Sequence, residues 1–403
     1  MDMSGVRGRE GTFTLNKKEA IHRWFAYMEG YSGILVEKEL ERIGYDRVHT
    51  LYDPFGGCGT SLLTASRHHI IPFYSEVNPV MGFVCDAKIN HVIHIRESAQ
   101  KRRLLREHYR YVSGMGLAVC PVSDYQGFEK FYDADRLSVL LQILAVIDEI
   151  EDEDVKNVCL VAIASIAVQV SKMVRRGDLR YAKGSEKEGV NQNVKEVYLE
   201  KLRQVIQDIE DEEAGLFTEV IRIADDARDV RGSNLFDCVI TSPPYLNGTN
   251  YVRNTKLELK LLGFVENEKD LPPLHSKGIM AGINSVSKRS HVEILPCVKP
   301  YLDELEPVAY DKRIPVMVAG YFYDMDRVIR SLGETVKPAG SFIMDIGDSA
   351  FSGVHIPTHV LLERIAVSHG FEKYGEEVLR VRHSKNGTEL SQRVLRFRNA
   401  KEM

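Results

Sequence analysis

The stretch that decides the fold is "VHTLYDPFGGCGTSLLTASRHHIIPFYSEVNPV", residues 48–80. Its first apolar segment predicts a strand, "DPFGGCGT" (53–60) predicts a glycine loop, and the apolar residues that follow predict a helix. A second predicted strand then ends at an acidic residue, Glu76. A strand, a glycine loop, a helix and another strand in this order form the first half of a doubly wound, mostly parallel α/β sheet.

Other segments continue this sheet or interrupt it. The sequence predicts further strands at 236–241, 341–346, 377–382 and 393–398, and helices at 18–44 and 321–340. Apolar stripes at helical spacing replace the strand pattern from about 95 to 213, and they predict a helical insertion. A polar stretch at 266–317, with several prolines and glycines and no sustained period, is a second insertion or a long loop. The chain therefore divides into parts at 14–94, 95–213, 214–265, 266–317 and 318–403.

The composition is that of an ordinary globular protein. The 403 residues are 44% hydrophobic and 28% charged, and the formal net charge of −5 argues against a protein that is basic all over. The six cysteines form no C-x-x-C pair, so we expect free thiols in a reducing compartment and no metal site. The first residues lack an apolar signal core, and the longest apolar stretch, "VCLVAIASIAV" (158–168), is too short for a bilayer. We expect a cytoplasmic protein with no membrane partner.

Three segments predict a binding site for an adenosine-bearing ligand without phosphates. The glycine loop is not followed by Gly-Lys-Ser/Thr, which disfavours a triphosphate, and it lacks the dinucleotide fingerprint. A carboxylate at Glu76, after the second strand, can accept both hydroxyl hydrogens of a ribose. The acidic cluster "ADDARD" (224–229), ahead of the strand at 236–241, can reach an adenine amino group.

A rigid turn follows the strand "FDCVIT" (236–241). The next residues, "SPPY" (242–245), contain a double proline, and each proline ring removes a hydrogen-bond donor and fixes φ. The strand must therefore stop at Thr241. Such a turn holds its backbone carbonyl groups in fixed directions at the end of a core strand.

Together, "DPFGGCGT", "EVNP", "DDAR" and the later "TSPPY" resemble the amino-methyltransferases of DNA, which use S-adenosylmethionine and methylate an exocyclic amine. The resemblance covers 18–93, 221–264 and 318–398, and it implies a Rossmann-like methyltransferase fold. It implies a cofactor pocket lined by Asp53, Phe55, Gly57, Gly59, Thr60 and Glu76, with Asn78 beside them and Asp226 at the adenine. It also implies a catalytic turn formed by Ser242, Pro243, Pro244 and Tyr245.

The resemblance implies a mechanism for this turn. The Ser242 hydroxyl and the Pro243 carbonyl would accept hydrogen bonds from the target amine and favour a pyramidal nitrogen, which attacks the methyl group directly. Tyr245 would stack on a base flipped out of the duplex. A leading serine, as in Ser242, is more common in enzymes that act on the 4-amino group of cytosine, so we favour N4-cytosine over N6-adenine.

The resemblance also implies partners. The substrate would be double-stranded DNA, a cognate restriction endonuclease is a candidate partner, and one of the two insertions would read the target. Weak candidates for DNA contact are Arg175, Arg176, Arg180 and Tyr181, in a stretch that is otherwise a solvated loop, and Asn250 and Arg253 after the turn. The sequence makes no prediction of the oligomeric state.

Three other readings compete with this one. The tRNA guanine N2-methyltransferases have a similar glycine loop, but their turn begins with Asp and they usually carry an N-terminal RNA-binding domain. A 5-methylcytosine enzyme would use a Pro-Cys nucleophile, and Pro296-Cys297 exists here, but it follows the Ser-Pro-Pro-Tyr turn and lacks the Glu-Asn-Val partner motif. A non-catalytic subunit would be expected to lose the turn or the glycines.

Overall fold

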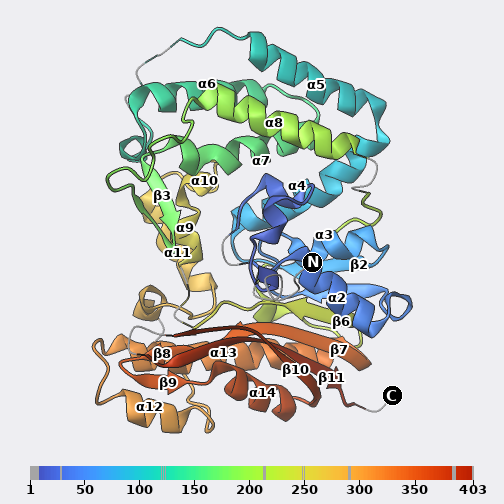
Figure 1. Cartoon of the computed structure of the whole chain (residues 1–403), viewed down its shortest axis with the longest axis vertical. Helices are drawn as coiled ribbons and strands as arrows, with labels where there is room; N and C mark the ends of the chain where they lie inside the picture. The colour runs from blue at the N-terminus through green and yellow to red at the C-terminus, as the bar shows by residue number, and fades with distance from the viewer. Residues whose placement is uncertain are drawn as a thin grey trace.

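The computed structural model describes residues 9–27, 30–118, 120, 122, 124–211, 215–246, 248, 250–288, 292–383 and 387–401. Its centre is a seven-stranded sheet (Figure 1). The strands, in their order across the sheet, are β10 (Phe371–His383), β11 (Glu389–Asn399), β7 (Val336–Gly347), β6 (Phe236–Thr241), β1 (Thr50–Asp53), β2 (Ile71–Ser75) and β5 (Ile221–Ala224). Every neighbouring pair from β7 to β5 is parallel, and β11 runs antiparallel to both β7 and β10.

This topology confirms the predicted doubly wound α/β fold. The chain proceeds from β1 outward to β2 and β5 in one direction, and from β6 to β7 in the other. The strand order therefore reverses between β1 and β6. Ligands of such sheets bind outside the carboxyl ends of the strands at this switch point.

Helices cover the sheet and form a separate layer beside it. The helices around the sheet are α2 (Gly33–Ile43), α3 (Thr60–Arg67), α4 (Pro79–Glu97), α13 (Arg313–Thr335) and α14 (Thr358–Ser368). The helical layer consists of α5 (Ala99–Gly114), α6 (Ala134–Asp148), α7 (Glu153–Val170) and α8 (Val194–Glu210), and it carries the hairpin of β3 (Met173–Arg176) and β4 (Asp178–Tyr181). In Figure 1 this layer lies above the sheet, with α4 leading into it. Most of the apolar stretch at 158–168 is buried, and it lies within α7.

Short elements connect these parts. They are the helices α9 (Tyr251–Asn254), α10 (Lys256–Leu261), α11 (Leu271–Lys277) and α12 (Lys299–Leu305), the strands β8 (Ser349–Phe351) and β9 (Val354–Ile356), and the 3₁₀ turns at Leu15–Lys17, His22–Trp24, Tyr45–Arg47, Glu129–Phe131, Ala227–Asp229, Glu268–Asp270 and Ile283–Lys288. In the described part of the chain, no helix combines the length and the apolar character needed to cross a membrane.

Several local predictions were wrong. The segment 18–44 is not one helix, because Trp24 and Phe25 are buried in the core and Ser32 caps a new helix, α2. The basic stretch at 171–184 is mostly a β-hairpin and not a loop. The stretch 266–317 contains α11 and α12, and α13 begins at Arg313 and ends at Thr335, so "KPAG" (337–340) lies within β7. The short strand β5 was not predicted.

Candidate functional site

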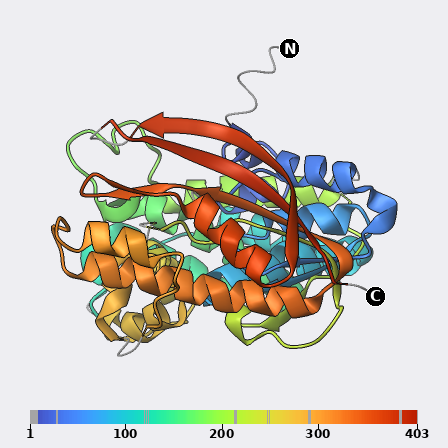
Figure 2. The same cartoon turned by 90° about the horizontal axis from the view of Figure 1, so that it is seen from below.

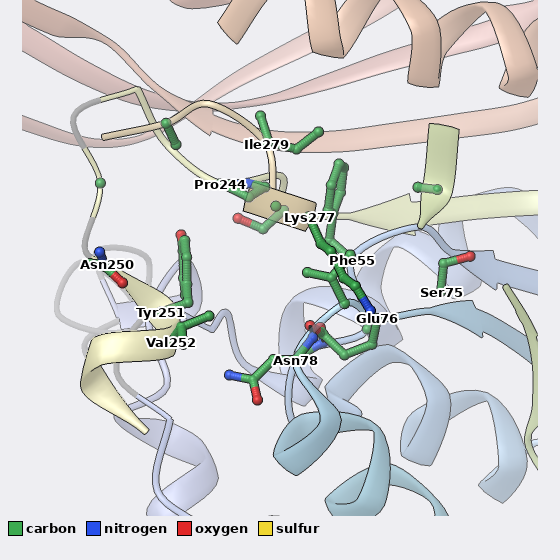
Figure 3. A pocket seen from close by; sticks show the side chains of 18 of the residues that line it. Phe55, Ser75, Glu76, Asn78, Pro244, Asn250, Tyr251, Val252, Lys277 and Ile279 are labelled. Atoms are coloured by element: carbon green, nitrogen blue, oxygen red, sulfur yellow. Dashed lines mark hydrogen bonds between the residues drawn. The ribbon is translucent and has the colours of Figure 1, made fainter. Parts of the chain in front are cut away.

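A cavity of about 300 Å³ opens at the carboxyl ends of β1, β2, β5 and β6. Residues predicted to hold a cofactor line it: Asp53, Phe55, Gly57, Thr60, Glu76, Asn78 and Asp226. From the turn after β6, Ser242 and Pro244 also line it. In Figure 3, Phe55 and Glu76 lie on one side of this cavity and Asn250 and Tyr251 on the other. The fold thus joins the glycine loop, two acidic strand ends and the proline turn in one site.

The glycine loop depends on two left-handed residues. Gly57 has φ +51° and Gly59 has φ +81°, a region that residues with a side chain rarely adopt. Gly59 does not line the cavity; it is the N-cap of α3, and a Cβ there would lie 3.2 Å from the Cys85 sulfur. Gly59 therefore shapes the loop, whereas Gly57 presents its backbone to the cavity.

Asp53 connects the two halves of the sheet. Its Oδ1 accepts hydrogen bonds from the Thr241 hydroxyl (2.7 Å) and the Phe55 N–H (3.0 Å), and its Oδ2 accepts from the hydroxyls of Tyr31 (3.1 Å) and Ser61. Burial raises the pKa of this carboxyl group. Since a carboxylate offers about four acceptor positions, protein donors occupy them all. Asp53 thus fixes the loop after β1 against the end of β6.

Glu76 retains acceptor capacity. Its Oε2 accepts from the Gly57 N–H and its Oε1 from the Asn78 N–H, both at 2.8 Å. Burial raises its pKa to about 7. These two N–H groups use two of the about four acceptor positions of the Glu76 carboxylate, and the others are available to a ligand at the end of β2. The neighbouring Asn78 side chain caps α4 and donates to the Thr255 hydroxyl at 2.9 Å, so it supports the cavity wall.

Asp226 belongs to a buried charge network. Arg228 donates through Nε to both Asp226 oxygens (2.9 and 3.0 Å) and through Nη1 to Asp324 (2.8 Å). Burial acts to raise the pKa of Asp226, but the hydrogen bonds and the charge of Arg228 outweigh it and lower the pKa. Asp226 is therefore a fixed anionic group at the end of β5, and both its oxygens accept hydrogen bonds from Arg228.

The proline turn contacts a buried carboxyl group that sequence reasoning missed, Asp345 of β7. The Tyr245 hydroxyl donates to its Oδ2 at 3.1 Å, and the Gln392 amide donates to both oxygens at 2.9 and 3.0 Å. Burial raises the pKa of Asp345 to about 7, although hydrogen bonds from Gln392, Tyr245 and Ser242 act to lower it. A signal was present, since Asp345 is the one charged residue in the apolar strand "SFIMDI" (341–346).

Pro243 and Tyr245 do not line the cavity. Pro243 is buried, and the ring of Tyr245 lies against Gly347, where a Cβ would come within 3.0 Å of the ring. The tyrosines that do line the cavity are Tyr27, Tyr31 and Tyr251, and the rings of Tyr27 and Tyr251 stack with centroids 6.5 Å apart. In this structure, Tyr251 supplies the aromatic wall that follows the turn, and the stacking role of Tyr245 stays a prediction.

Both segments between the sheet parts reach the cavity. Residues 274–285 contribute one wall, and Asp178 contributes from the tip of the β3–β4 hairpin. Asn254 fixes this hairpin, since its Oδ1 accepts from the Leu179 N–H (2.7 Å) and its Nδ2 donates to the Gly177 carbonyl (2.8 Å).

The predicted DNA-contacting residues differ in their availability. Arg175 is directed inward, where it donates to the Asn254 carbonyl (2.7 Å) and to Glu258 (2.6 Å), and its DNA contact stays a prediction. Arg180 and Arg176 both pair with Glu186, and Arg176 and Tyr181 are exposed. Asn250 lines the cavity, and Arg253 is an exposed residue of α9.

Comparison with known proteins gives a consistent set of relatives. No family model matches the sequence. The chain is 26% identical to the type II methyltransferase M.AvaI of a Nostoc species, over 89% of this chain and 81% of that protein. It is 25% identical to M.BsoBI of Geobacillus stearothermophilus (90% and 80%) and 22% identical to M.MvaI of Kocuria varians (90% and 84%), also type II methyltransferases. The similarity therefore extends well beyond the glycine loop and the turn.

Among solved structures, the chain matches the rRNA methyltransferase aviRa from Streptomyces viridochromogenes. The identity is 10%, and the match covers 99% of this chain and 94% of that chain, with a TM-score of 0.29. This similarity is too weak to support an argument about function.

Proposed function

We propose that this chain is a DNA methyltransferase that transfers a methyl group from S-adenosylmethionine to the 4-amino group of cytosine. One observation carries the proposal: Ser242 lines the cavity of the glycine loop and Glu76 and lies beside the buried carboxyl group of Asp345, which Tyr245 of the same turn hydrogen-bonds. Similarity to type II methyltransferases along most of the chain supports the proposed reaction class.

The cavity fits the cofactor. Gly57 allows close approach of the backbone, since a Cβ there would lie 3.2 Å from the Tyr27 ring. The free acceptor positions of Glu76 suit the two ribose hydroxyl groups. Asp226, whose oxygens Arg228 already bonds, lies at the next strand end, where we propose that the adenine amine binds. When bound, S-adenosylmethionine supplies an electrophilic methyl group on its sulfonium sulfur.

The turn and Asp345 act on the target amine. The Ser242 hydroxyl accepts a hydrogen bond from the amine and directs its lone pair toward the methyl group. The Pro243 carbonyl, whose residue does not line the cavity, stays the predicted second acceptor. Bound S-adenosylmethionine would supply the methyl group, and the methylated amine would then carry an excess proton. Ser242 passes that proton to Asp345, whose pKa of about 7 lets it accept a proton near neutral pH.

We propose that the β10–β11 ribbon contacts the DNA substrate at the same edge of the sheet. Strand β10 ends at the carboxyl edge, and its last pairs with β11 extend past the end of β7 at Gly347. Figure 2 shows the two strands as a long ribbon that reaches the side of the molecule opposite the C-terminus. Arg380, Arg382 and His383 are exposed on this ribbon. A two-stranded ribbon fits the major groove, and its arginines suit phosphate contacts.

Incubation with labelled S-adenosylmethionine and duplex DNA, followed by digestion and mass identification of the nucleosides, tests the function. We expect label in N4-methylcytosine. Label in N6-methyladenine would overturn the choice of base, and label only in RNA would overturn the choice of DNA. Ser242→Ala should abolish turnover with cofactor affinity unchanged. Ser368→Ala, whose hydroxyl bonds the Ile365 carbonyl at the end of α14, is the matched control.

A further inference from the structure

A cluster of metal-ligating side chains lies outside the cavity, where α4 meets α7. His91 and His94 lie three positions apart on α4, and Asp154 lies in the first turn of α7. The Nδ1 atoms of His91 and His94 lie 2.5 and 2.9 Å from the same oxygen, Asp154 Oδ1. Within the ranges that the structure describes, this is the one group of such side chains whose ligand atoms all lie within 4.8 Å of one another.

The surrounding groups hold both imidazole rings in position. The Nε2 of His94 donates to Glu219 at 2.9 Å, and the Nε2 of His91 lies 3.1 Å from the Asn157 amide, which can present either its oxygen or its nitrogen. Lys101 binds the other oxygen of Asp154, Oδ2. Metal-ligating histidines typically donate their second ring N–H to a carboxylate or carbonyl in this manner.

We propose that His91, His94 and Asp154 bind a divalent transition-metal ion, of which Zn²⁺ suits the ligands best. Two imidazole nitrogens and one carboxylate oxygen are ligands that zinc prefers, and the partial exposure of His94 leaves a further position open to solvent. Lys101 restricts Asp154 to one ligating oxygen. Glu219 and Asp154 together balance much of the added positive charge.

This site is independent of the proposed methyl transfer. None of its residues lines the cavity. It lies on α4, whose first residue follows Asn78 at the cavity, and on α7, the buried centre of the helical layer. A bound ion would therefore link the sheet to the helical layer and stabilise their packing. Sequence spacing alone did not indicate the site, because Asp154 is 60 residues from His94.

Equilibrium dialysis of the full, untagged chain against Zn²⁺, with metal analysis, tests the proposal. We expect one ion per chain and a higher Tm in its presence. The single variant His94→Gln and the double variant His91→Gln, His94→Gln should bind Zn²⁺ about tenfold to a hundredfold more weakly and lose the gain in Tm. His359→Gln, which removes a histidine bound to a different buried carboxylate, Asp348, is the control and should bind as the wild type does.

Co²⁺ provides a second measurement that does not depend on how the variants fold. In the wild-type chain we expect d–d absorption without the near-ultraviolet band of a cobalt–thiolate bond. A thiolate band would assign the ion to cysteine and overturn the proposal. Absence of saturable binding, or equal binding by the double variant, would also overturn it, whatever the outcome for methyl transfer.

Discussion

Asp345→Asn tests the proposed proton acceptor directly, because it removes the carboxylate and keeps the volume. Asp345 is 3% exposed and its pKa is raised to about 7 by burial, so the group ionises in the working pH range of an enzyme. We expect the wild-type kcat to rise as pH rises through about 7 and the variant kcat to show no such step. A positioned general base contributes about 10² to 10⁴ in rate, so kcat at pH 8 should fall by that factor.

The same substitution changes the dependence of stability on pH. Folding raises the pKa of Asp345 from the ordinary value of 3.8 to about 7, a shift of roughly 3 units. At 1.36 kcal/mol per unit, this shift corresponds to about 4 kcal/mol of folding free energy that depends on pH. The folded protein holds this proton more tightly than the unfolded chain. The stabilisation is therefore complete below pH 3.8 and is lost as pH rises through 7. The free energy of unfolding in urea should differ less between pH 5 and pH 8 in the variant than in the wild type.

Two measurements can refute this reasoning. A variant that keeps the wild-type step in kcat near pH 7 would show that another group accepts the proton, and a parallel loss of cofactor affinity would show damage to the cavity. Asp348→Asn is the matched control. Its carboxylate lies three residues further on and pairs with His359 and Ser391, so its loss should affect stability and leave the pH profile of kcat unchanged.

Four further substitutions test other parts of the protein, and a fifth serves as a control. Burial raises the pKa of Glu76 to about 7, so the affinity of the wild type for the cofactor, measured by calorimetry, should increase as pH rises through 7. Glu76→Gln should abolish this pH dependence and weaken cofactor binding about tenfold to a hundredfold. Asn254→Ala should lower the free energy of unfolding in urea by about 1–3 kcal/mol, because it leaves the buried backbone N–H of Leu179 in the hairpin unpaired. Arg380→Ser and Arg382→Ser should each reduce, by about one, the slope of log DNA affinity against log salt concentration. Arg398→Ser lies at the opposite end of the same ribbon and should leave the slope unchanged.

The fold could be predicted because its signals are local. A strand, a glycine loop and a helix follow one another within residues 48–67, and each has its own pattern of apolar residues. Once the strands are parallel, topology alone places the residues after β1, β2 and β6 at one edge of the sheet. Asp53, Glu76 and Ser242 therefore meet as predicted, although they lie far apart in the sequence.

Asp345 could not be placed in this way, because its position depends on register between distant strands. The pair Thr241 and Met344 aligns β6 with β7, so the next residues, Ser242 and Asp345, come together. A shift of one residue would turn Asp345 to the other face of the sheet. The same holds for Gln392, which reaches Asp345 through the pairing of β11 with β7. Such pairings carry no local sequence signal.

Two buried aspartates flank the end of β6, and their hydrogen bonds distinguish their roles. The acceptor positions of Asp53 are filled by donors of the protein itself, two of which join β1 to β6 and to the Tyr31 hydroxyl. Asp345 instead meets the cavity through Ser242, a hydroxyl that can accept from a ligand and donate to the carboxylate at the same time. Burial raises both pKa values, so the electrostatic environment alone does not separate them. Their place beside the turn differs: Asp53 is bonded by Thr241 of β6, whereas Asp345 lies beside Ser242, which we propose binds the amine. We therefore propose that Asp53 positions the turn and that Asp345 exchanges the proton.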